Sequence, residues 1–255
     1  MTAWTPGALA PAPAAASRRQ MLLSQTRAEL TLMLRNGEQL LLTLVIPLGL
    51  LVGLTLVPAV EVTGRRVDFF VPGVLALAVM STAFTGQAIQ TGFDRQYGVL
   101  KRLGATPLPR SVLLQAKTLA VLTVEALQVA LLCGTGLLLG WEPHGSLLGV
   151  LLLVVLGTAA FSGLGLLVGG TLPGLTTLAV ANLLWFVMLA LGGVVFPLEE
   201  YGGAADVLRL LPAGALADGL RELLQHGDLV VQDVLALAAW AVATLGAASR
   251  AFRWE

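Results

Sequence analysis

The sequence predicts an all-α polytopic membrane protein with six transmembrane helices, an N-terminal interfacial amphipathic helix, and short outer re-entrant helices between the fifth and sixth spans. Of its 255 residues, 56% are hydrophobic and only 12% are charged, and the mean hydropathy is +0.85. This composition is typical of proteins that cross the bilayer several times. Six apolar runs are each about as long as the ~20 residues that a helix needs to cross a hydrocarbon core. One basic stretch, residues 94–117, interrupts these runs and has no apolar span of its own.

The N-terminal region divides into two parts. Residues 1–17 are rich in alanine and proline and lack the basic start and continuous apolar stretch of a signal peptide, so we expect a disordered tail. In residues 18–38, leucines and methionines alternate with arginines in a helical rhythm. This pattern predicts a helix that lies in the membrane interface, although a plain helical extension of the first span would also fit.

The spans and their connections follow from the positions of charge, proline and glycine. Together the spans form a membrane domain over residues 39–249. They are predicted at 40–60, 69–93, 118–140, 145–171, 174–198 and 229–249. Pro173 and its flanking glycines separate the fourth span from the fifth. Residues 199–228 are too apolar for a free loop, and Pro212 divides them into two leucine-rich stretches, so we expect two short helices that dip into the outer leaflet.

The distribution of basic residues predicts the orientation. Eleven of the fifteen Lys and Arg fall on the side that also holds both termini and the short tail 250–255. The four on the other side are Arg65, Arg66, Arg209 and Arg221. Because cytoplasmic loops retain Lys and Arg, we expect both termini and the loop 94–117 to lie in the cytoplasm.

The basic loop carries an amphipathic pattern of its own. After the charged turn at Asp94, and before Gly104 and Pro107 end the pattern, apolar and basic side chains alternate. These side chains are Arg95, Tyr97, Val99, Leu100, Lys101, Arg102 and Leu103. They predict a short helix suited to docking into a cleft of another protein. The alternative is an ordinary solvated loop that is basic because it is cytoplasmic.

The residues themselves favour the docking helix. FDRQYGVLKRLGATPLPRSVLLQAK, residues 93–117, resembles the cytoplasmic loop of ATP-binding-cassette (ABC) type-2 exporter permeases, particularly the small membrane subunits of the daunorubicin-exporter kind. A second family pattern, in residues 210–221, is matched at Leu210, Pro212, Asp218, Leu220 and Arg221. Leu211, Gly214 and Ala215 depart from it and replace the amide, hydroxyl and phenol that the family carries near the outer mouth.

The resemblance implies a half-transporter in a bacterial cytoplasmic (inner) membrane. It would pair with a second copy of itself as a homodimer, or with a related permease, and would dock two copies of a separate ABC ATPase subunit. The implied ATPase-coupling residues are Asp94, Arg95, Tyr97, Gly98, Leu100, Lys101, Arg102 and Leu103. The implied activity is export of a hydrophobic or amphipathic compound, such as a drug, a lipid or a lipid-linked glycan.

Several other activities find no support in the sequence. It has no G-x-x-x-x-G-K-[ST] motif, so ATP and magnesium would be held by the partner ATPase, and we expect no cofactor and no enzymatic activity in this chain. His144 and His226 are isolated, so we expect no metal site. The basic residues are spread among short loops and do not form the concentrated surface that nucleic-acid binding needs.

Two carboxylates fall inside predicted spans, where each costs ~2.5–3.5 kcal/mol at a helix centre. Glu125 shares a helix face with Gln128 and should point into the bundle, in a structural hydrogen bond or ion pair or in a proton or substrate role. A proton-coupled secondary transporter that uses Glu125 is therefore an alternative function, and a non-transporting scaffold is another. Asp233 lies one turn inside the outer boundary, where we expect it to reach headgroup water.

Three further sets of residues are candidates for the transport path. A small-residue stripe on the second span would suit a dimer seam or a path wall: Ala78, Ser81, Thr85 and Ala88. On the fifth span, Asn182, Trp185 and Phe186 could contact an amphipathic ligand, although Trp185 is more simply a core residue. In the re-entrant segment, Pro212, Leu216 and Leu220 could form an outer gate. The spacing Gly165-x-x-x-Gly169 is interpreted as ordinary helix packing.

Overall fold

The structure is a computed structural model that describes residues 15–57, 64–194, 196 and 198–252. Every regular element in these residues is a helix, and six helical stretches are long and apolar enough to cross a membrane. They are Gly37–Leu56, Arg66–Gln96, Arg110–Leu138 (α7), Leu147–Thr171 (α8), Gly174–Leu191 (α9) and Val231–Ala251 (α12). The predicted all-α fold with six spans is confirmed. The third span begins at Arg110 and not at residue 118, because the basic segment before it continues the helix.

The first two spans each contain a π-helical segment. The first span consists of α2 (Gly37–Leu40), η1 (Leu41–Val45) and α3 (Ile46–Leu56). The second consists of α4 (Arg66–Val79), η2 (Met80–Gly86) and α5 (Gln87–Gln96). A π segment widens the helix by a residue and perturbs the regular ladder of backbone hydrogen bonds. In η1, the backbone carbonyl oxygen of Thr43 accepts a hydrogen bond from a side chain of α7.

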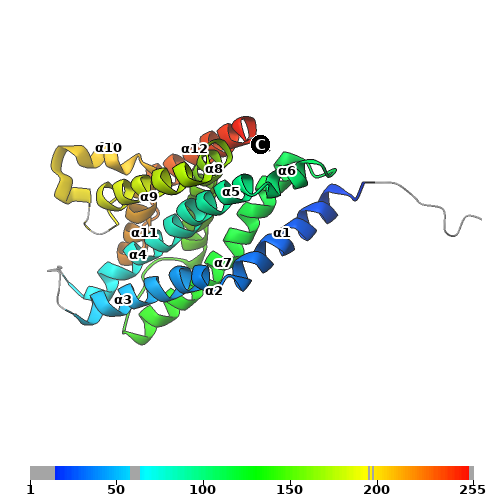
Figure 1. The fold of residues 1–255 in the computed structure, drawn as a ribbon. Helices are drawn as coiled ribbons and strands as arrows, with labels where there is room; N and C mark the ends of the chain where they lie inside the picture. Colours follow the sequence, from blue (N-terminus) through cyan, green and yellow to red (C-terminus); the bar gives the residue numbers. More distant parts are fainter. Residues whose placement is uncertain (1–14, 58–63, 195, 197, 253–255) are drawn as a thin grey trace, which may run out of the picture.

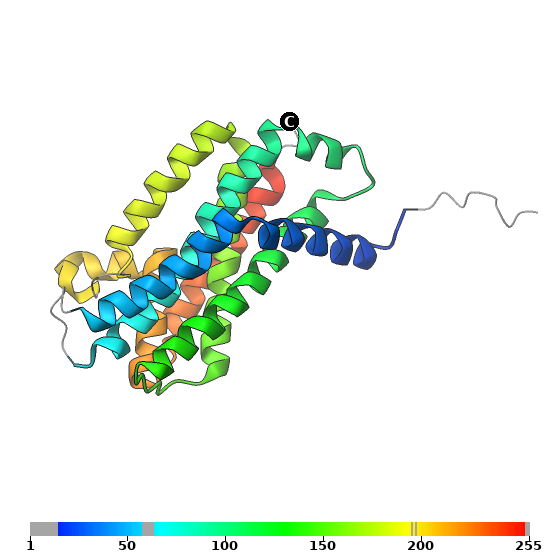
Figure 2. The same cartoon turned by 60° about the horizontal axis from the view of Figure 1, so that its bottom comes forward.

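The N-terminal helix α1 (Arg18–Arg35) is separate from the first span. Ser17 and Gln20 form a capping box at its start. It ends at Asn36, whose extended backbone breaks the helix and whose side chain accepts a hydrogen bond from the backbone N–H of Gln39 to begin α2. Figure 2 shows α1 leaving the first span at an angle. The alternative of a plain helical extension is therefore wrong, and α1 packs along α7 instead. Residues 1–14 of the predicted tail lie outside the described residues.

Helix α8 is the centre of the bundle and packs against α12, α5, η2 and α11. Its glycines allow these close approaches. A Cβ atom added to Gly165 would lie 2.7 Å from the carbonyl oxygen of Phe84 in η2, and one added to Gly169 would overlap the carbonyl oxygen of Ala88 in α5. Real Cβ atoms do not approach so closely, so only glycine fits at these two positions.

The bundle has two different ends (Figure 1). The short helix α6 (Val99–Gly104) and the C-terminal end of α12 lie at one, which we call the α6 end. At the other, the α11 end, lie η3 (Leu198–Ala204), α10 (Ala205–Arg209) and α11 (Pro212–His226).

The segment between the fifth and sixth spans folds back into the bundle. Helix α9 ends at Leu191 and not at residue 198, because Gly192 and Gly193 follow and Gly193 takes a left-handed backbone with φ +67°. Pro212 occupies the first turn of α11, where its missing N–H costs nothing. Most of α11 is buried against α4, α8 and α12, so this segment is part of the core.

Candidate functional site

A tight turn joins α5 to α6. Gly98 takes a left-handed backbone conformation with φ +71°, which glycine adopts without steric cost. The guanidinium of Arg102 reaches back and donates hydrogen bonds to the carbonyl oxygens of Gly98 and Tyr97, each at 3.3 Å. These bonds fix the direction of α6 relative to α5.

One face of α6 is held by a small apolar cluster. Leu100 is fully buried and packs with Leu113 of α7, Leu166 of α8 and Phe252 at the end of α12. Burying a side chain of this size contributes ~1.5–3 kcal/mol. Arg110 adds a hydrogen bond at 3.1 Å to the carbonyl oxygen of Phe252. Three spans therefore converge beneath the short helix α6.

The other face of α6 is exposed. Tyr97 is 67% exposed, and its ring stacks on that of Phe93 with the centroids 5.9 Å apart. Lys101 and Arg102 are exposed as well. Helix α6 thus combines a fixed apolar face with an exposed basic face, and the exposed Tyr97 lies beside it at the end of α5.

Three charged side chains from three helices meet beside α6. The Nζ of Lys117, on α7, lies 2.8 Å from Oδ2 of Asp94 on α5 and 3.0 Å from Oε2 of Glu29 on α1. The side chains of Lys117, Glu29 and Asp94 are 3%, 6% and 22% exposed. Gln25 donates a further hydrogen bond to Oε1 of Glu29 at 2.8 Å. We call Glu29, Asp94 and Lys117 the ion cluster.

The ion cluster joins α1, α5 and α7 mechanically. Removing one member of a buried charge pair leaves the other charge uncompensated in a poorly hydrated place, which is strongly unfavourable. Movement of the end of α5 therefore carries α1 and α7 with it or breaks these contacts.

The end of α5 also contacts the connection between α8 and α9. Nη1 of Arg95 lies 3.4 Å from the carbonyl oxygen of Leu172 in this connection. A Cβ atom added to Gly92 would lie 2.9 Å from Cβ of Thr177, which shows how closely α5 and α9 approach. The α5–α6 turn is therefore coupled by direct contacts to most of the α6 end.

The structure gives the predicted coupling residues distinct positions. Tyr97, Lys101 and Arg102 form the exposed face, Leu100 and Leu103 face the apolar cluster, and Gly98 makes the turn. Asp94 and Arg95 bond to the bundle instead of lining the exposed face. Sequence reasoning missed the role of Glu29, and its only signal was an acidic residue on an otherwise basic helix.

The predicted intramembrane polar residues lie on α7 and face the bundle. Glu125 is fully buried, and the hydroxyl of Thr158 on α8 donates to its Oε2. Gln128 bonds to both π-helical segments: its Nε2 donates to the carbonyl oxygen of Thr43 at 2.6 Å, and its Oε1 accepts from Thr82 at 3.1 Å. These contacts hold the first, second and fourth spans against the third.

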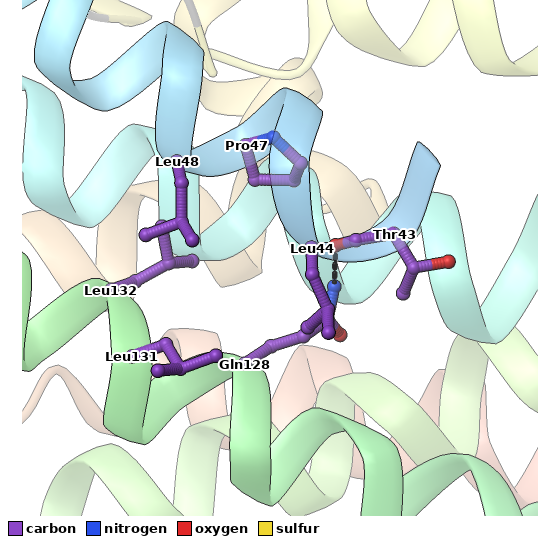
Figure 3. A pocket seen from close by; sticks show the side chains of 7 residues that line it. All are labelled: Thr43, Leu44, Pro47, Leu48, Gln128, Leu131 and Leu132. Atoms are coloured by element: carbon purple, nitrogen blue, oxygen red, sulfur yellow. Dashed lines mark hydrogen bonds between the residues drawn. The ribbon is translucent and has the colours of Figure 1, made fainter. Parts of the chain in front are cut away.

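A shallow hollow lies between the first span and α7 (Figure 3). It is lined by Thr43, Leu44, Pro47, Leu48, Gln128, Leu131 and Leu132. It encloses no space for even a water molecule, whereas typical small-molecule sites have volumes of ~300–1,000 Å³. The polar groups drawn there, the Gln128 amide and the Thr43 carbonyl, are already bonded to each other. The hollow does not accommodate a drug-sized cargo in this conformation.

The candidate path residues do not gather in one place. Ala78 and Ala88 are buried within the chain, whereas Ser81 and Thr85 are partly exposed. The indole N–H of Trp185 donates to the hydroxyl of Ser81 at 3.0 Å, which joins α9 to η2. On α9, Asn182 and Phe186 point outward and are exposed.

The candidate outer-gate residues are core residues of α11. Pro212, Leu216 and Leu220 are all buried. Arg221 on the same helix donates to the carbonyl oxygen of Gly193 at 2.9 Å and lies over the ring of Phe69, with its guanidinium carbon 5.3 Å from the centroid. The segment thus closes this end of the bundle in the structure.

The prediction for Asp233 is wrong. We expected its carboxylate to reach headgroup water, but the residue is 0% exposed. Its carboxyl group faces Gly219 of α11, because α11 folds back over the start of α12 and covers it. The local sequence of α12 gives no indication that α11 buries Asp233.

The six apolar helices together define a multi-pass helical membrane protein. The family model for the ABC-2 type transporter matches residues 20–224, and the chain belongs to that family. It is also similar to the protein named "Putative transport permease YvfS" of Bacillus subtilis (strain 168), with 22% identity over 231 residues, 86% of this chain and 92% of that protein. The chain is therefore the membrane component of an ABC transporter, a family that pairs with an ABC ATPase subunit.

Proposed function

We propose that this chain is the permease subunit of an exporter that moves a hydrophobic or amphipathic compound out of the cytoplasm or the inner leaflet. A separate ATPase subunit, present in two copies, holds ATP and magnesium and docks at the α6 end. That end and both termini face the cytoplasm of a bacterial inner membrane, in agreement with its excess of Lys and Arg.

The observation that carries this proposal is the construction of α6. Its buried Leu100 ties it to the bundle, and its exposed face presents Lys101 and Arg102, next to the exposed Tyr97 at the end of α5. A partner that binds this face gains a rigid connection to three spans. ATP hydrolysis can drive transport only if movement of the ATPase favours one conformation of the bundle over another. The turn at Gly98 and the ion cluster provide the route for that movement.

A second copy of the chain completes the transporter in this proposal. The first span and α9 are the least buried of the six spans. On α9, Leu175, Leu183 and Phe186 are exposed, so the helix presents a continuous apolar face. Such a face can be covered by lipid or by the same helix of a second copy. A cysteine at Leu183 that forms a disulfide between two copies in the membrane would support the homodimer.

The docking role is tested by reversing the exposed charges of α6. The double variant K101E/R102E should insert normally but lose the ATPase that copurifies with the wild-type chain. The matched control is R250E, since Arg250 is another exposed basic residue expected on the same side. Equal retention of the ATPase by both variants would refute the docking assignment.

The alternative of proton-coupled transport is tested at Glu125. In an ATP-driven exporter, E125Q should keep ATP-dependent transport, because glutamine can still accept the hydrogen bond from Thr158. Transport by the wild-type chain that follows a proton gradient without ATP, and that is lost in E125Q, would replace the proposal with the secondary transporter.

A further inference from the structure

Asp233 is buried in the contact between α11 and α12. It lies in the first turn of α12 and is 0% exposed. Neither carboxyl oxygen has a hydrogen-bond partner among the described residues. A Cβ atom added to Gly219 would lie 3.3 Å from Cβ of Asp233 and 3.4 Å from its Oδ2. The carboxyl group therefore faces α11 and has no solvent-exposed surface.

The charges around Asp233 do not compensate an ionised carboxylate. On α11, Asp218 is also buried, and its Oδ2 is held by Nε of Arg209 on α10 at 2.7 Å. Glu222 lies one turn further along α11, with its Oε2 3.2 Å from Nδ1 of His226. Helix α8, which packs on the same contact, carries no charged residue, and α12 carries no other until Arg250. Arg221 points away from Asp233, toward Gly193 and Phe69.

Two buried acids thus share one nearby arginine. An ionised carboxylate without a cation or hydrogen-bond donor is very costly to bury, and such a group takes up a proton instead.

We propose that a proton on Asp233 closes the α11–α12 contact. As the neutral acid, Asp233 packs against Gly219. When the proton leaves to water, the carboxylate must regain solvent, and α11 separates from α12. Since α11 carries the buried Leu216 and Leu220, the separation opens the α11 end. We call this protonated α11–α12 contact the clamp. The proposal rests on the proposed orientation, which places the α11 end outside the cell, so the clamp responds to external pH.

A cysteine reporter on α11 tests the clamp in intact cells. In a C133S background, L220C is buried and V207C is exposed, since Val207 is 65% exposed on α10. Both are reacted with a membrane-impermeant maleimide as the external pH is raised. Dividing the labelling rate of L220C by that of V207C cancels the pH dependence of the reaction between thiol and maleimide.

The labelling ratio of L220C to V207C should rise with pH, by about tenfold per pH unit while the acid form dominates, because opening requires loss of one proton. D233N keeps the shape without the ionisable group, so its ratio should stay constant and low. Equal pH profiles in D233N and in the chain with Asp233 would overturn the proposal.

R209Q provides a second test. Its readout is the pH at which the labelling ratio rises, which would not change if Asp233 had a purely structural role. Removing the nearby cation makes the carboxylate of Asp233 harder to form, so the rise in the ratio should shift to higher pH. A profile that is unshifted by R209Q would overturn the proposal. Absence of external labelling at V207C would overturn the orientation instead, and with it the placement of the clamp outside the cell.

Discussion

Lys117 is the residue whose loss should damage the α6 end most. K117M keeps the length and apolar stem of the side chain but removes the cation from the ion cluster. Glu29 and Asp94 then remain as two carboxylates near one another, and Glu29 is only 6% exposed. Breaking a buried ion pair in this way costs ~3–5 kcal/mol. For a chain of this size, that corresponds to roughly 6–20 °C in the midpoint of thermal unfolding.

The prediction is checked by heating detergent-solubilised protein and following the folded fraction by size-exclusion chromatography. Asp94 is 22% exposed and can turn toward water, whereas Glu29 cannot. Adding E29Q to K117M should therefore restore most of the lost stability. The matched control is K101M, which removes an exposed lysine and should change stability by less than about 0.5 kcal/mol. If K117M is no worse than K101M, or if E29Q gives no rescue, the ion cluster does not stabilise the α6 end.

Three smaller predictions follow from backbone and packing. G98A should cost ~1–2 kcal/mol, because a residue with a Cβ resists the left-handed backbone at this turn, and it should weaken ATPase copurification in parallel. G169V should cost ~1–3 kcal/mol by forcing α8 away from α5, whereas G134A, where an added Cβ meets nothing within 4 Å, should be neutral or slightly stabilising in the same unfolding assay. W185F should cost ~0.5–1.5 kcal/mol through loss of its hydrogen bond, and adding S81A should cost little more, which a double-mutant cycle would measure.

The α6 end was partly visible in the sequence. The residues of the α6 turn are contiguous, so Gly98, Leu100 and the basic pair Lys101 and Arg102 could be recognised as one short amphipathic helix. The predicted short helix is therefore confirmed with nearly correct bounds, at Val99–Gly104, whereas its docking role stays a prediction. The pairing of Asp94 with Lys117 was not anticipated, because Lys117 lies on a different helix, α7.

The surroundings of the candidate path residues, in contrast, could not be predicted from the sequence. The small residues on the second span identified a face that permits close packing, but periodicity does not say what lies against it. The structure places α8 there, with Gly165 and Gly169 against η2 and α5. Ala88 is buried by this contact within one chain. Any seam with a second copy must therefore use the parts of the face that α8 leaves uncovered.

The sequence by itself determined the properties that are local along the chain: six apolar spans, a separate basic helix before them, and a short amphipathic helix after the second span. Each depends on the composition and periodicity of one stretch, which the membrane and the backbone select without help from other stretches. Only the tertiary structure decided which polar groups meet. The Lys117–Glu29 pair joins residues 88 positions apart, and Asp233 is buried because the preceding helix, α11, folds back over the start of α12. Burial and pairing each require two surfaces that pack together, and the local sequence describes only one of those two surfaces.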